Sequence, residues 1–234
     1  MSEIKKLLGY HAVDRNVESG MRIGLGTGST AVWAVKRVAE KLSDGKLSNL
    51  SLFATSSQTE AACDELGLST YSLNDPRIAG VLDLTIDGAD EIDPAGNLTK
   101  GGGGALLREK IAAFCSRRYV IVGDDSKLVQ SLGMSFPLPL EVVPLARRVV
   151  LEALRAMGAE ATVREAVRKM GHVITDNGNI IIDARFRERH DPAELERRLD
   201  SIPGVVETGL FVGMKPVVYL GAADGSIREL QLSE

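Results

Sequence analysis

The chain has 234 residues, of which 44% are hydrophobic and 26% are charged, and its formal net charge is −4 at pH 7. This composition is typical of a globular protein and excludes an intrinsically disordered chain. The balanced charge also argues against a general nucleic-acid-binding surface, which needs clustered Lys and Arg, so we expect no nucleic-acid partner. The length suits one large domain, or a main domain that carries a smaller one.

The beginning of the chain predicts neither export nor membrane insertion. The first ten residues include Glu3, Lys5 and Lys6 and lack the apolar stretch of a secretory signal. No run approaches the roughly 20 apolar residues that cross a bilayer. We therefore expect a cytoplasmic location and no membrane partner.

Short apolar runs alternate with longer periodic segments in the first half of the chain. Strands are predicted at 21–25, 50–55, 81–86 and 119–122, and helices at 30–42 and 59–66. This alternation favours a mainly parallel sheet with helices on both faces. Ligands of such a sheet lie outside the carboxyl ends of the strands, so functional residues are expected directly after each strand.

The pattern of the sequence changes around 131–144, a short stretch that contains three prolines. The elements expected beyond it follow a β-α-β-β-α-β order, which suggests a ferredoxin-like module. They are a strand near Glu141, a helix at 145–157, a strand near Ala161, a hairpin that pairs 172–175 with 180–184, a helix from Pro192 and a strand near Val206.

The predicted fold class is therefore α/β, with a Rossmann-like, mainly parallel sheet domain and a smaller α+β ferredoxin-like domain. Residues 216–230 look like two strands joined by an Asp-Gly turn, which could return to the first domain. We expect residues 1–131 plus 208–234 to form the Rossmann-like catalytic domain, and residues 132–207 to form the smaller domain.

A glycine-rich segment, Gly-Leu-Gly-Thr-Gly-Ser-Thr at 24–30, follows the first predicted strand and precedes a helix. Backbone N–H groups and hydroxyls in such a loop can converge on an anion at the helix N-terminus, and phosphate is the obvious guest. The loop also matches a loose dinucleotide pattern, but the second strand ends without the acidic residue that a dinucleotide site needs. A tight turn without a ligand is the alternative interpretation.

Four carboxylates follow the third predicted strand, in the segment Asp-Gly-Ala-Asp-Glu-Ile-Asp at 87–93. Such crowding costs electrostatic energy unless cations or hydrogen-bond donors offset it. A calcium loop is disfavoured, because Ala89 stands where that pattern needs an oxygen ligand. An acidic surface turn is the alternative.

Lys100 and four consecutive glycines at 101–104 run directly into a predicted helix at 105–117. Four glycines are costly to order, because each loses more backbone entropy than any other residue would. The run therefore favours a backbone that approaches a ligand closely. Lys100 and the amide groups would then supply positive potential where an oxyanion forms.

Glu109 lies about one turn beyond these glycines. Leu107, Ile111 and Phe114 recur at helical spacing and predict the apolar stripe of the helix, with Glu109 on another side. A solvent-facing carboxylate is the ordinary interpretation of such a position. After a glycine-rich loop, however, a carboxylate is placed to serve as a base for carbon acids.

Four motifs occur in an order and spacing that resemble the A-type ribose-5-phosphate isomerases: GLGTGST, DGADE, KGGGGAL followed by REK, and VGDDSK. The likeness extends through EVVP at 141–144, VITDNGN at 173–179 and IPGV at 202–205. It implies an aldose-ketose isomerase that interconverts ribose 5-phosphate and ribulose 5-phosphate in the non-oxidative branch of the pentose phosphate pathway. It also implies a homodimer or homotetramer and no metal or organic cofactor.

The resemblance further implies roles for individual residues. Glu109 would move a proton between C1 and C2 of the open-chain sugar through a cis-enediolate. Lys100 and the amides of the following glycines would stabilise the oxyanion, while Asp87 and Asp90 would contact sugar hydroxyls, Asp87 being the better candidate for assisting ring opening. The implied substrate-binding set, in which Lys5 and Lys127 meet the phosphate, is Thr27, Gly28, Ser29, Thr30, Asp87, Gly88, Ala89, Asp90, Lys100, Gly101, Gly102, Gly103, Lys127 and Lys5.

Two other functions are open. One is a related sugar-phosphate deaminase that uses the same first loop, and the other is a sugar-phosphate-binding module of the kind attached to some regulators. In a binding module, Glu109 and Lys100 would have no catalytic role. No metal site is predicted, because the three histidines, at 11, 172 and 190, show no ligand spacing.

Overall fold

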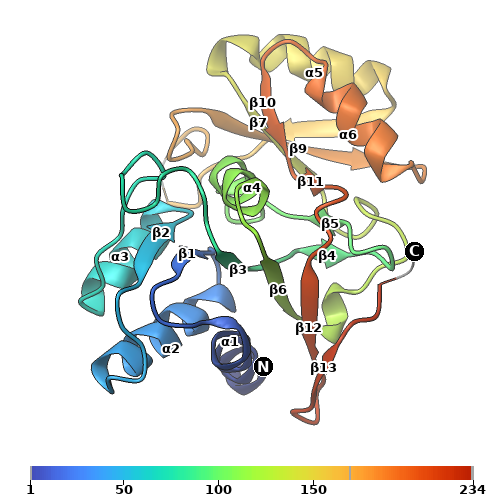
Figure 1. Ribbon diagram of the computed structural model, residues 1–234. Coiled ribbons are helices and arrows are strands. Elements are labelled where there is room, and N and C mark those ends of the chain that lie inside the picture. Colours follow the sequence, from blue (N-terminus) through green and yellow to red (C-terminus); the bar gives the residue numbers. More distant parts are fainter. Residues whose placement is uncertain (1, 169, 233–234) are drawn as a thin grey trace. The chain divides into compact units, whose positions relative to one another are not determined.

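The computed structural model of the protein describes residues 2–168 and 170–232 (Figure 1). Its backbone contacts divide the chain into two compact units. The first unit contains residues 2–89, Arg108–Lys127 and Met214–Leu232, and the second contains Asp90–Leu107 and Leu128–Gly213. The domain boundaries expected at 131 and 208 stay a prediction, and positions 1, 169, 233 and 234 of those domains lie outside the described residues.

A six-stranded sheet forms the centre of the first unit, in the order β13-β12-β6-β3-β1-β2. All neighbouring strands are parallel except β13, which pairs antiparallel with β12. The strands are β1 (Arg22–Leu25), β2 (Ser51–Ala54), β3 (Leu84–Gly88), β6 (Tyr119–Asp124), β12 (Val217–Gly221) and β13 (Ile227–Glu229). The predicted α/β class with a mainly parallel sheet is therefore confirmed.

Helices cover both faces of this sheet, because its strands carry apolar side chains on both faces. On one face, Ile23 and Ile86 share a core with the helices α1 (Ser2–Asn16), α2 (Ala31–Ser43) and α3 (Ser57–Glu65). On the other face, Thr85 bonds Ser116, at the end of α4 (Leu106–Phe114), with 2.7 Å between the hydroxyl oxygens. A short 3-10 helix, η1 (Asp125–Lys127), follows β6.

The second unit contains an antiparallel sheet in the order β10-β7-β9-β8. The expected β-α-β-β-α-β order is observed. Its elements are β7 (Leu138–Val142), α5 (Arg147–Ala156) after the 3-10 helix η2 (Pro144–Ala146), β8 (Ala159–Val163), β9 (Ile180–Phe186), α6 (Pro192–Asp200) and β10 (Val205–Thr208). Leu140 and Ile182 of the sheet pack with Val150 of α5 and Leu199 of α6. Helix α6 begins at the Pro of an Asp-Pro pair, because Asp191 caps it by accepting the Glu194 N–H.

One predicted pairing in this unit is wrong. Residues 172–175 do not form a hairpin with β9; only Ile174 makes an isolated bridge to Ile180. The turn between them exists, since the Thr175 N–H donates to the Asn179 carbonyl at 2.8 Å. The rest of β9 pairs instead with β7 and β8, because its alternating residues Ile180, Ile182 and Ala184 complete the buried face of the sheet.

A small antiparallel sheet in the second unit was not predicted. It contains three two-residue strands in the order β11-β5-β4, namely β4 (Glu91–Ile92), β5 (Leu98–Thr99) and β11 (Leu210–Phe211). It places the segment after Thr99 beside β11, since the Lys100 N–H donates to the Gly209 carbonyl at 2.8 Å. No helix in the parts of the chain that the structure describes is long and apolar enough to cross a membrane.

Candidate active site

The glycine loop of the first unit links the carboxyl end of β1 to α2. Gly26 is buried, and its N–H donates to the Ile86 carbonyl at 2.9 Å. A Cβ atom at this position would lie 2.2 Å from Asp87 Oδ1 and 2.6 Å from Asp87 Cα, so only glycine fits. Gly28 has a φ of 108°, which glycine adopts without strain. The loop conformation therefore requires glycine at both positions, for two different reasons.

Four hydroxyl side chains lie beneath this loop, and we call them the hydroxyl cluster: Thr27, Thr55, Ser56 and Thr59. Thr27 Oγ1 lies 2.8 Å from Thr55 Oγ1 and donates to Ser56 Oγ at 2.7 Å. Thr59 donates to the Gly26 carbonyl at 3.0 Å. The hydroxyl of Thr27 thus bonds within the protein. Its predicted substrate contact stays a prediction, and Gly28 and Ser29 are the more exposed part of the loop.

Asp87 lies at the end of β3, beside the glycine loop. Its side chain is fully buried, and Oδ1 accepts the Thr27 N–H at 3.2 Å and the Gly88 N–H at 2.7 Å. These bonds hold one oxygen of the carboxylate in place. The strand begins and ends later than the predicted 81–86 and includes Asp87 and Gly88, so this carboxylate belongs to the sheet rather than to a surface turn.

Positive side chains gather near the same end of the sheet. Lys5 of α1 donates to Ser29 Oγ at 2.8 Å. Lys127 ends η1, directly after β6. Burial raises the pKa of Asp124, but hydrogen bonds from Ser126 and the charges of Lys127 and Lys5 outweigh it and hold that pKa below its ordinary value. Both lysines therefore act on one carboxylate, and the first unit brings together Lys5, Ser29 and Lys127 as predicted phosphate contacts.

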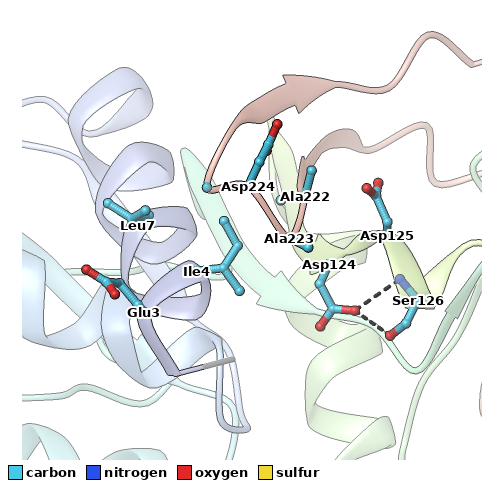
Figure 2. A pocket seen from close by; sticks show the side chains of 11 residues that line it. Glu3, Ile4, Leu7, Asp124, Asp125, Ser126, Ala222, Ala223 and Asp224 are labelled. Atoms are coloured by element: carbon cyan, nitrogen blue, oxygen red, sulfur yellow. Dashed lines mark hydrogen bonds between the residues drawn. The ribbon is translucent and has the colours of Figure 1, made fainter.

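A hollow of about 800 Å³ lies beside these groups in the first unit (Figure 2). Figure 2 shows that Glu3, Ile4 and Leu7 of α1 line one side and that Asp124 to Ser126 and the β12–β13 turn line the other. The acidic side chains of Asp124 and Asp224 already accept hydrogen bonds from Ser126 and Ser226, respectively. The wall of this hollow is therefore acidic and apolar, unlike the lysine-bearing region that would hold a phosphate.

The glycine-rich segment of the second unit, Gly101–Gly104, follows β5. Lys100 is 3% exposed, and its ammonium lies 5.6 Å from the centre of the Phe211 ring. Gly101 and Gly104 have positive φ values of 100° and 77°, and the Gly104 N–H donates to the Gly101 carbonyl at 2.9 Å. Four glycines thus form a tight turn between a strand and a helix, and not a linker.

Asp90 reaches this turn from the segment after β3. Its Oδ2 accepts the Gly102 N–H at 2.8 Å. A Cβ atom on Gly102 would lie 2.8 Å from Asp90 Oδ1, so a larger residue there would displace the Asp90 carboxylate. Gly102 and Gly103 are exposed. The second unit therefore brings together Asp90, Lys100 and Gly101–Gly103 of the predicted site.

Two side chains that organise this region were not predicted as part of the site. Arg164, just after β8, donates to the carbonyls of Gly101 and Gly102 at 2.9 and 3.0 Å. Glu91 is buried and accepts N–H groups of Gly133, Ser135 and Phe136. Glu91 belongs to the DGADE motif and could have been considered, whereas nothing in the sequence distinguishes Arg164 from the other arginines.

Glu109 lies in the first turn of α4 and is 4% exposed. The predicted apolar stripe points the other way, since Ile111 is 42% and Phe114 is 83% exposed. The buried face carries Ala112 and Ala113 at helical spacing from Glu109. The interpretation of Glu109 as a solvent-facing carboxylate is therefore wrong, and the helix is buried on the face that holds the carboxylate.

Comparison with known proteins places the chain in one family. Residues 51–225 match the model of ribose 5-phosphate isomerase A, also called phosphoriboisomerase A. The ribose-5-phosphate isomerase A of Treponema denticola is 49% identical over 98% of this chain and 99% of its own length. The chain belongs to the ribose 5-phosphate isomerase A family. The predictions of that family and of an isomerase are thereby confirmed.

Solved members of the ribose 5-phosphate isomerase A family share the whole architecture. The enzyme from Plasmodium falciparum has a TM-score of 0.91 at 38% identity, and each chain covers 100% of the other. A D-ribose-5-phosphate isomerase solved in complex with phospho-erythronic acid has a TM-score of 0.92 at 39% identity, over 98% of both chains. In the described parts of our chain, no group of three or more His, Cys, Asp or Glu side chains could hold a metal ion.

Proposed function

We propose that the chain interconverts D-ribose 5-phosphate and D-ribulose 5-phosphate by moving a proton between C1 and C2 through a cis-enediolate, with Glu109 as the base. The observation that carries this proposal is the burial of a carboxylate in the first turn of a helix that follows a glycine-rich turn. Burial favours the neutral form of a carboxylate and so makes it a stronger base, and one group can serve both C1 and C2 because it reaches them from the same face of a cis-enediolate.

The enediolate needs hydrogen-bond donors where its negative charge develops. Lys100 and the amides of Gly101, Gly102 and Gly103 are the groups that we assign to this task. The proposal is supported by the burial of Lys100 and by the tight turn that Gly101 and Gly104 allow. A single preorganised donor of this kind is worth about a hundredfold to a thousandfold in rate.

Ring opening precedes the proton transfer, because the substrate must present an open-chain carbonyl. We assign Asp87 to assist this step, and Asp87 and Asp90, with the backbone of Gly88 and Ala89, to contact sugar hydroxyls. Asp87 is supported in this role because N–H groups of Thr27 and Gly88 hold its Oδ1 in one orientation. A carboxylate that is held rigidly loses less entropy when it binds a substrate.

The phosphate would bind in the first unit, to Lys5, Lys127 and the loop from Thr27 to Thr30. This assignment is supported by the Lys5–Ser29 hydrogen bond of 2.8 Å and by the N-terminus of α2, which begins at Ala31. A family member bound to phospho-erythronic acid, a phosphorylated sugar acid, is consistent with it. Assembly as a homodimer or homotetramer and a cytoplasmic location stay predictions.

The decisive experiment measures both the product formed and the deuterium incorporated into it. The chelator-treated wild-type protein is incubated with ribose 5-phosphate in D₂O, and ribulose 5-phosphate and the deuterium incorporated at C1 or C2 are measured by NMR. Proton transfer through an enediolate admits solvent deuterium, whereas a hydride shift does not. Glu109→Gln should fold normally and lower turnover and deuterium incorporation by at least about a hundredfold.

Glu65→Gln is the matched control, because it makes the same change at an exposed position of α3, another nine-residue helix. It should convert ribose 5-phosphate at the wild-type rate. Near-normal turnover of Glu109→Gln would remove Glu109 from the mechanism. No conversion by the wild-type protein, together with ammonia release from glucosamine 6-phosphate, would favour the deaminase instead.

A further inference from the structure

Arg164 is held rigidly by the antiparallel sheet of the second unit. It directly follows β8, and its N–H donates to the Ile181 carbonyl of β9 at 2.8 Å. Its own carbonyl accepts the Val173 N–H at 2.9 Å. Both backbone groups of Arg164 are therefore bonded, so the side chain starts from a well-defined position.

The guanidinium of Arg164 bridges β9 and the glycine turn. Its Nε and Nη2 donate to the two carboxylate oxygens of Asp183, the Nε bond being 2.8 Å long. Its Nη1 donates to the carbonyls of Gly101 and Gly102. The side chains of Arg164 and Asp183 are 18% and 19% exposed. A planar guanidinium whose donors engage four acceptors is fixed in orientation, and charge-assisted bonds of this kind are stronger than neutral ones.

These two carbonyl contacts determine where the neighbouring amides point. In a planar trans peptide the C=O and N–H bonds point in opposite directions. Because the carbonyls of Gly101 and Gly102 face Arg164, the N–H groups of Gly102 and Gly103 face away from it. The Gly102 N–H does so, since it donates to Asp90. Glycine peptides can rotate with little steric penalty, so this arrangement depends on the contacts that Arg164, Asp90 and the Gly104 N–H make with the turn.

We infer that Arg164 is a positioning residue for the isomerisation, which holds the Gly101 and Gly102 carbonyls so that the Gly102 amide stays bonded to Asp90 and the Gly103 amide is directed at the developing oxyanion. The inference rests on the proposed function. Asp183 completes the arrangement by fixing the guanidinium. The antiparallel sheet of the second unit thereby acts as the scaffold of the oxyanion-stabilising turn.

The test replaces Arg164 by Met, which keeps the length of the side chain and removes its donors. We expect kcat to fall by about tenfold to a hundredfold, because a misdirected donor no longer meets the transition state. The KM for ribose 5-phosphate should change less than threefold, about 0.65 kcal/mol, since Lys5 and Lys127 belong to the first unit. Inhibition by phospho-erythronic acid, whose carboxylate mimics the oxyanion, should weaken, whereas inhibition by inorganic phosphate should not.

Arg187→Met is the matched control. Arg187 follows β9 and pairs with Glu160 of β8, so it makes the same kind of ion pair across the same two strands. Its side chain is 81% exposed, and its substitution should leave kcat unchanged. Should Arg164→Met fold poorly, Arg164→Lys keeps the charge but cannot bond two carbonyls and both oxygens of Asp183, and its kcat should be intermediate.

The amide NMR signals of Gly102 and Gly103 provide a readout independent of turnover. They should shift in Arg164→Met and stay unchanged in Arg187→Met. Wild-type kcat and unshifted amides in both Arg164 variants, beside an active wild-type enzyme, would overturn the inference alone. No conversion by the wild-type protein would overturn the proposed function and the catalytic part of the inference together, and the amide signals would still show whether Arg164 holds the turn.

Discussion

Thr59 offers a direct test of how the hydroxyl cluster supports the glycine loop. It lies in the first turn of α3 and is 4% exposed. Its hydroxyl donates to the Gly26 carbonyl at 3.0 Å and lies 3.1 Å from Ser56 Oγ and 3.2 Å from Thr27 Oγ1. Because the next residue, Thr27, bonds Asp87 through its N–H, the cluster also supports the proposed ring-opening carboxylate.

Thr59→Val removes these contacts and keeps the shape of the side chain. A buried acceptor left without its donor costs about 1–3 kcal/mol. The extra methyl group that is buried recovers less than about 1 kcal/mol. We therefore expect the free energy of unfolding to fall by about 1–2 kcal/mol. If half of that loss is also felt in substrate binding, KM rises by about twofold to fivefold.

The assay combines urea unfolding with a double-mutant cycle between Thr59→Val and Thr27→Val. The two residues share one network, so their effects should be non-additive by about 0.5 kcal/mol or more. Thr162→Val, at an exposed position of β8, is the control and should change stability by less than about 0.5 kcal/mol. The reasoning fails if Thr59→Val is as stable as the control variant and the cycle is additive.

Two further predictions concern charged groups. Hydrogen bonds from Arg22 outweigh burial and hold the pKa of Asp83 below its ordinary value. Asp83 therefore contributes stability above pH ~4 that is lost as the pH falls through its lowered pKa. Urea midpoints should fall less from pH 7 to pH 3 in Asp83→Asn than in the wild type, and parallel curves would contradict this. Lys127→Ala should raise KM for ribose 5-phosphate at least about tenfold with little change in kcat, whereas Lys46→Ala, on an exposed turn, should not. An unchanged KM and phosphate affinity would remove Lys127 from the phosphate site.

The alternation of apolar and periodic segments was sufficient to predict the parallel sheet. Each predicted strand of that sheet occurs, and three of the predicted functional segments lie at the carboxyl ends of β1, β3 and β6. This success has a physical cause. Strands that are buried on both faces need continuous apolar runs, and the loops after them must carry whatever binds a ligand. Lys5 and Ser29 are joined by a hydrogen bond although 24 residues separate them, and only the family resemblance led us to expect both residues in the substrate site.

Features that depend on distant partners could not be predicted. The strands β4, β5 and β11 have two residues each, too few for any periodic pattern. Arg164 contacts a carbonyl 63 positions away, and its neighbours in the sequence give no sign of that contact. Residues 172–175 resemble a hairpin strand because the residues after them favour a tight turn. In the structure, however, β7 and β8 occupy the two hydrogen-bonding edges of β9.

The buried face of helix α4 differs from the face that the sequence pattern predicts. A helix normally buries its apolar stripe, yet α4 exposes Phe114 and buries Glu109. Burying a carboxylate costs free energy unless hydrogen bonds or opposite charges offset it. On the same face, Ala112 packs with Ile78 and Leu82, and its carbonyl lies 3.5 Å from the Thr85 hydroxyl of β3. Such a conflict between sequence pattern and structure is expected at functional sites, because stability is given up there for chemistry. The burial of Glu109 in α4 is therefore the observation on which its proposed role as the base rests.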